Sequence, residues 1–167
     1  MRKAQPLRVT TAALALLTFV FGTIATGQST SERDVAKSFI GTWRLVSITL
    51  NGQINPDRGP NPTGLIIYDG NGYMAVQIMP DRERPKYVGS KPTGEEAQAA
   101  LLGYTAYFGT YTVDAVAGTV THHRQGNVIP GVAREVVRRY EFAPGDRVIL
   151  TPVENPASRL TWERVKK

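Results

Sequence analysis

The stretch YFGTYTVDAVAGTVTHHR, residues 107–124, decides the fold because it predicts two strands joined by a tight connection. Side chains of the first strand alternate between two faces, one of which holds Tyr107, Gly109, Tyr111 and Val113. Alternation with a period of two is typical of a half-buried β-strand. Residues 114–118 supply turn residues at the spacing of a hairpin. We therefore expect antiparallel strands to extend this hairpin on both sides.

Turn residues separate further strands along the chain. Strand patterns occur at 41–50, 63–69, 73–79, 133–142, 147–153 and 159–165, and with the hairpin they number eight. Most connections are short, including the strong hairpin turn DGNG at 69–72. A closed sheet leaves no strand edge exposed. The series therefore predicts an all-β fold, an eight-stranded antiparallel up-and-down barrel, with a β-sandwich as the alternative.

Two short helices are expected beside the strands. Ser31 and Asp34 form a weak capping box at the start of an N-terminal helix. Thr93 and Glu96 form a second capping box, followed by good helix formers as far as Tyr104. The charged loop 80–92 precedes this inserted helix. This loop is either a solvated connection or a mobile flap over a cavity mouth.

The first strand has two faces of ambiguous character. One face holds Trp43, Leu45, Ser47 and Thr49, and the other holds Arg44, Val46, Ile48 and Leu50. The second face is too apolar for open water. A β-bulge, a covering segment or a partner chain would each explain it. The partner-chain alternative predicts a possible homodimer through this outer strand face.

The N-terminal residues 1–27 have the pattern of a cleavable signal peptide. Arg2, Lys3 and Arg8 form a basic start, an apolar run follows from Val9 to Ala25, and small residues mark a cleavage site before Gln28. The run is short for a full membrane span. No cysteine lies near the cut, so a lipoprotein is not expected. We expect a periplasmic or secreted protein with no stable membrane span after cleavage, an N-terminal segment at 28–38 and a barrel domain at 39–167.

Composition limits the classes of function. The chain of 167 residues has no cysteine, which excludes thiolate chemistry and disulfides. Removal of residues 1–27 would leave 17 basic against 14 acidic residues, a net charge of +3, and the basic residues are scattered. A nucleic-acid partner is therefore not expected, since such proteins cluster their basic residues.

Several short motifs resemble those of the bacterial and fungal lipocalin-like domain family. They are GTWRLVS at 41–47, GYM at 72–74, YxxYFGTY at 104–111, GTVTHH at 118–123, RYxF at 139–142 and LTWER at 160–164. The resemblance covers nearly the whole chain after residue 38. It implies a small antiparallel barrel with an internal cavity. It also implies that Trp43 closes one end of the barrel and that Arg164 lies across it, where a cation–π contact is worth about 0.5–2 kcal/mol.

Polar and aromatic side chains expected on inward strand faces form the candidate ligand-binding set. They are Tyr73, Gln77, Tyr107, Tyr111, His122, Arg138 and Tyr140. His122 and His123 are adjacent and point to opposite sides of a strand, so they cannot share one metal ion. His122 shares a face with Val120 and is the better inward candidate. Neither a metal site nor a cofactor is expected, since two histidines without cysteine supply no zinc-binding spacing.

Three functions follow as hypotheses. The first is an exported, noncatalytic barrel that binds a small, partly apolar molecule in its cavity. The second is a small barrel enzyme, an isomerase or cyclase, that uses His122 or a lumen tyrosine as an acid–base beside Arg138. The third is an envelope interaction protein that uses the outer apolar face of Val46, Ile48 and Leu50. No nucleophile, phosphate-binding or dinucleotide-binding motif is present.

Overall fold

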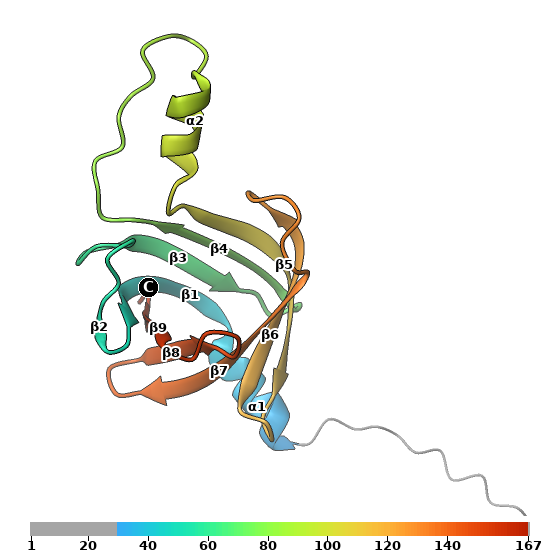
Figure 1. Ribbon diagram of the computed structural model, residues 1–167. Coiled ribbons are helices and arrows are strands. Elements are labelled where there is room, and N and C mark those ends of the chain that lie inside the picture. The colour runs from blue at the N-terminus through green and yellow to red at the C-terminus, as the bar shows by residue number, and fades with distance from the viewer. Residues whose placement is uncertain (1–29, 167) are drawn as a thin grey trace, which may run out of the picture.

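The computed structural model describes residues 30–166, so the predicted signal peptide lies outside the described residues. Its strands are β1 (Gly41–Leu50), β2 (Gln53–Ile54), β3 (Thr63–Tyr68), β4 (Tyr73–Met79), β5 (Thr105–Asp114), β6 (Thr119–Asn127), β7 (Glu135–Ala143), β8 (Arg147–Pro152) and β9 (Ser158–Arg164). The helices are α1 (Thr30–Phe39) and α2 (Gly94–Leu101). β1 and β3 to β9 pair in series, and β1 also pairs with β9. The predicted closed barrel of eight antiparallel strands is confirmed (Figure 1).

A β-bulge resolves the ambiguous faces of the first strand. The register between β1 and β9 shifts between Leu45 and Ser47, so one extra residue reverses the alternation at that point. Trp43, Leu45 and Ile48 consequently all face the interior, and their exposed fractions are 1%, 6% and 4%. The predicted outer apolar face that included Ile48 is therefore wrong, and it gives no support to a homodimer through this strand.

The face of β4 that points into the barrel is the opposite of the predicted one. Buried Met74, Val76 and Ile78 alternate with exposed residues along the strand. Tyr73, 57% exposed, and Gln77 lie on the outer face, so their predicted place in the lumen is wrong. Both faces of β4 carry apolar residues, but the barrel buries the face that holds the longer aliphatic side chains, because this removes more apolar surface from water.

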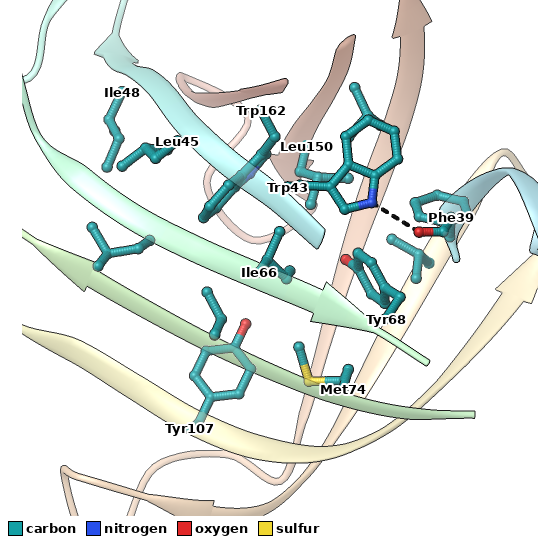
Figure 2. Packing of buried hydrophobic residues seen from close by; sticks show 14 of the residues in the cluster. Phe39, Trp43, Leu45, Ile48, Ile66, Tyr68, Met74, Tyr107, Leu150 and Trp162 are labelled. Atoms are coloured by element: carbon teal, nitrogen blue, oxygen red, sulfur yellow. Dashed lines mark hydrogen bonds between the residues drawn. The ribbon is translucent and has the colours of Figure 1, made fainter. Parts of the chain in front are cut away.

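The N-terminal helix α1 closes one end of the barrel. Phe39 is fully buried, and the Nε1–H of Trp43 donates to its carbonyl oxygen at 2.8 Å (Figure 2). The guanidinium of Arg164 lies 4.0 Å from the centre of a Trp43 ring and donates to the carbonyl oxygens of Ser38 and Ile40, both at 2.7 Å. We refer to this arrangement, Phe39, Trp43 and Arg164, as the closed end.

The inserted helix α2 lies at the opposite end and stands away from the barrel together with its flanking loops (Figure 1). The predicted capping box is present, since the Thr93 hydroxyl accepts from the Glu96 N–H and the Glu96 carboxylate accepts from the Thr93 N–H. The helix has no buried residue. It is therefore stabilised by its cap and by hydrogen bonds from Arg82 and Arg84 to the carbonyl oxygens of Ala99 and Ala100, rather than by apolar packing. Within residues 30–166, no helix is long and apolar enough to span a membrane.

Candidate functional site

A polar network lies in the middle of the barrel interior, among the buried apolar side chains. His122 on β6 is fully buried. Its Nε2 lies 2.7 Å from the Tyr68 hydroxyl oxygen, and its Nδ1 lies 2.8 Å from the Tyr107 hydroxyl oxygen. Nη2 of Arg138 donates to the same Tyr107 oxygen at 3.2 Å. The four side chains, hereafter the central network, form one continuous chain of hydrogen bonds across the lumen.

Strand geometry brings these four side chains together. Tyr68 ends β3, Tyr107 lies near the start of β5, and Arg138 lies in the middle of β7. His122 on β6 pairs with Tyr111 of β5 on one side and with Val136 of β7 on the other. Its ring faces the barrel interior, where it is fully buried. His123 takes the opposite face, where Thr112 and Glu135 hydrogen-bond its ring. Alternation along β6 thus places one histidine inside and one outside, as expected for adjacent strand residues.

The environment keeps His122 neutral. Burial lowers the pKa of His122 well below its usual value, and the nearby charges of Arg138 and Arg124 lower it further. Burial also raises the pKa of the Tyr68 hydroxyl well above its usual range. A neutral imidazole has one N–H donor and one acceptor nitrogen. Each nitrogen of His122 therefore has a suitable tyrosine partner, and the central network holds no formal charge except that of Arg138.

Two adjoining cavities continue from the central network toward the end of the barrel opposite α1. The deeper cavity, of about 20 Å³, is lined by Tyr107, His122, Arg138 and Trp162 among apolar side chains. The outer cavity, of about 630 Å³, lies at the strand ends and is hereafter called the mouth. Four residues line both cavities: Ile78, Thr105, Arg138 and Leu160. The two spaces are therefore the inner and outer parts of one lumen.

Charged side chains surround the mouth. Arg58, Arg82 and Arg138 line it, together with Asp57 and Asp81. Arg58 donates to the Gly103 carbonyl oxygen and, at 3.1 Å, to the Thr105 hydroxyl oxygen. Arg82 donates to the carbonyl oxygens of Ala99 and Leu102. Arg58 thus binds the strand and loop beside the mouth, Arg82 binds the C-terminal end of α2, and Arg138 points toward the central network.

The predicted ligand-binding residues separate into three groups. Tyr107, His122 and Arg138 lie together in the central network and line the deeper cavity. Tyr111 and Tyr140 also face inward, but toward the closed end. Tyr111 donates to the Asp69 carbonyl oxygen at 2.9 Å, and the Tyr140 ring lies 5.2 Å from that of Phe39. Tyr73 and Gln77 lie outside, as described above.

Sequence reasoning missed three residues of the site. Tyr68 shares an inward face with Gly64 and Ile66, so alternation along β3 could have identified it. Trp162 shares one face of β9 with Leu160 and Arg164, so the same alternation that placed Arg164 inward could have added it to the set. Arg58 lies in an irregular loop, where no periodicity exists to indicate which way a side chain points.

The catalytic hypothesis for His122 stays a prediction. Both ring nitrogens are already within hydrogen-bond distance of a tyrosine hydroxyl. Of the four network residues, Arg138 alone also lines the mouth, so a molecule entering from there would meet Arg138 first.

The fold and this interior define a class of protein. A closed up-and-down barrel with a partly apolar lumen, a few placed polar groups and one accessible end is a barrel of the ligand-binding type. The sequence profile of the lipocalin-like domain family matches residues 40–165, and the chain belongs to this family. Comparison with curated proteins gives no match.

Proposed function

We propose that this protein is an exported carrier that binds a small, partly apolar molecule in the lumen of its barrel. The observation that carries the proposal is the continuity of the mouth with the deeper cavity, through residues that line both. A volume of about 630 Å³ at the mouth lies within the range of pockets that hold small ligands. Ile78 and Leu160 supply apolar walls, and Arg138 supplies a placed polar group.

Export is supported by the sequence of residues 1–27, which combines a basic start, an apolar run and a small-residue cleavage site. A barrel without cysteine is compatible with an oxidising compartment, because it depends on sheet closure and core packing and not on disulfides.

Native mass spectrometry of protein purified gently from the producing cells tests the carrier function. We expect a retained small molecule, and we expect the neutral apolar fluorophore N-phenylnaphthylamine to bind and displace it. Leu160→Trp should abolish both signals, since a larger side chain at this position fills the lumen.

Arg159→Trp is the matched control, because it introduces the same side chain one residue away on the exposed face of β9. It should leave both signals unchanged. Two results together would exclude the carrier function. The protein would retain no small molecule, and Leu160→Trp would not reduce any fluorophore binding.

A further inference from the structure

Arg138 is a partly buried cation with no carboxylate partner among the described residues. The ion pairs found in residues 30–166 involve Arg44, Arg147, Arg159, Lys37 and His123. The hydrogen bond that Arg138 makes there goes to the neutral Tyr107 hydroxyl, at 3.2 Å. A buried charge is costly unless an opposite charge compensates it. The lumen therefore has an unbalanced positive group at the junction of the deeper cavity and the mouth.

Trp162, which lines the same cavity, has a buried donor without a partner in residues 30–166. This residue is 1% exposed and lines the deeper cavity with Arg138. Its buried Nε1–H has no hydrogen-bond acceptor within the described part of the chain. A buried donor without an acceptor is destabilising, so such groups in native structures need an explanation. A ligand atom that accepts a hydrogen bond would provide one.

The central network leaves the Tyr107 proton available as a third donor. In the described structure, the only partner of the buried Tyr68 hydroxyl is His122 Nε2. That hydroxyl satisfies its single proton by donating it, so Nε2 accepts and the proton of the neutral imidazole lies on Nδ1. The Nδ1–H then donates to the Tyr107 oxygen, which also accepts from Arg138. With both lone pairs used, the Tyr107 hydroxyl can only donate, and Tyr107 lines the deeper cavity.

The deeper cavity is thus surrounded by donors and lacks a charged acceptor. None of its lining residues is an aspartate or glutamate, and its other walls are mostly aliphatic. Its volume of about 20 Å³ holds roughly one water-sized atom. One oxygen of a head group fits there, while the rest of the ligand occupies the mouth.

From this arrangement we infer that the carried molecule has an anionic oxygen head group, bound by Arg138, the Tyr107 hydroxyl and the Trp162 indole N–H, with an apolar body extending toward Ile78 and Leu160. This inference rests on the proposed carrier function and names its ligand class. A carboxylate suits the small inner cavity best, because it is planar and pairs well with a guanidinium group.

Displacement of bound N-phenylnaphthylamine by ligands of equal chain length tests the inference. The competitors are decanoate, decyl sulfate, decanol and decyltrimethylammonium. We expect decanoate to compete at least about tenfold more strongly than decanol, since a hydrogen bond to a charged group contributes more than a neutral one. The cation should compete least. A preference for either anion over decanol supports the inference, and the order of the two anions identifies the head group.

Substitution of each named donor tests whether that donor causes the preference for decanoate over decanol. Arg138→Met should reduce the decanoate-to-decanol ratio to near unity, and Tyr107→Phe and Trp162→Phe should each reduce it several-fold. Arg159→Met, which removes an exposed cation that pairs with Glu141, is the matched control and should keep the ratio of the unaltered protein. Circular dichroism establishes that each variant is folded before its ratio is compared.

Equal competition by decanoate and decanol in the unaltered protein would overturn the inference and leave the carrier function standing, since the fluorophore still reports an apolar lumen. Retention of the full anion preference in Arg138→Met would overturn the assignment to this donor set. Absence of fluorophore binding altogether is the separate result that counts against the carrier function itself.

Discussion

The closed end and the lumen each combine one tryptophan with one arginine. The two pairs differ in whether their hydrogen-bond donors and charges have partners. At the closed end, the Trp43 indole N–H has an acceptor, and Arg164 donates to two carbonyl oxygens. In the lumen, the Trp162 indole N–H has no acceptor among the described residues, and Arg138 has no carboxylate. The same residue types therefore stabilise the fold in one region and leave hydrogen-bonding capacity free in the other.

The largest effect should come from the packing of the closed end. Trp43→Ala should lower the free energy of unfolding by about 3–5 kcal/mol, because it removes a fully buried aromatic side chain and leaves a cavity. Urea denaturation followed by circular dichroism measures this change. Tyr73→Ala, an exposed aromatic on the outer face of β4, is the control and should shift stability by less than about 0.5 kcal/mol. Equal losses in the two variants would show that the closed end does not dominate stability.

The buried His122 in the lumen should make the stability of the protein depend on pH. Since the pKa of His122 is lowered in the folded protein, the unfolded chain binds a proton at higher pH than the folded chain. Stability should therefore be constant above about pH 6.5 and fall below it, by up to about 1.4 kcal/mol for each pH unit.

Urea denaturation between about pH 7.5 and pH 5 measures this slope. His122→Gln should remove the His122 contribution to it, whatever its effect on overall stability. His123→Gln is the control on the outer face and should keep the steep slope. A slope that depends on His123 rather than His122 would contradict the burial argument.

The two arginines should differ in their contribution to stability. Arg164→Met removes a cation–π contact and two hydrogen bonds to carbonyl oxygens, so a loss of about 1–2 kcal/mol is expected. Arg138→Met replaces a partly buried charge without a carboxylate partner, so the change should be within about 0.5 kcal/mol or stabilising. Paired urea midpoints provide the comparison. A loss in Arg138→Met as large as in Arg164→Met would mean that both arginines are structural.

The smallest effect on global stability should come from α2. Thr93→Ala removes the capping box, but the helix buries no residue, so global unfolding should change by less than about 0.5 kcal/mol. Limited proteolysis should instead show faster cleavage within residues 80–104, because the local helix opens more often. Unchanged cleavage would indicate that α2 is held by contacts other than its cap.

Periodicity made the barrel and part of its interior predictable. The alternation along β5 correctly placed Tyr107 inside, because this strand has one more apolar face. On β6, the face shared with Val120 made His122 the better inward candidate, and the structure buries its ring. On β4 both faces contain apolar residues, so the choice of the Tyr73 face was wrong. The bulge after Leu45 was one of several alternatives, because a bulge depends on the register with β9 and not on the sequence of β1 alone.

The chemistry of the lumen was less predictable than its shape. The hydrogen bond between Tyr68 and His122 joins residues from β3 and β6, and no local pattern specifies such a pair. The unsatisfied Trp162 indole N–H is likewise a property of the three-dimensional surroundings, since the number of acceptors near a donor cannot be read from spacing.

Closure of the barrel between β1 and β9 has a consequence for the order of folding. Trp43 pairs with Arg164, so closing the barrel requires contact between the first and last described strands, which are far apart in the sequence. Contacts of such large sequence separation slow folding, typically to the millisecond-to-second range. A nascent chain that lacks β9 exposes one edge on β1 and another on β8, and both edges can pair with other chains. The final strand thus converts an aggregation-prone open sheet into a barrel without free edges.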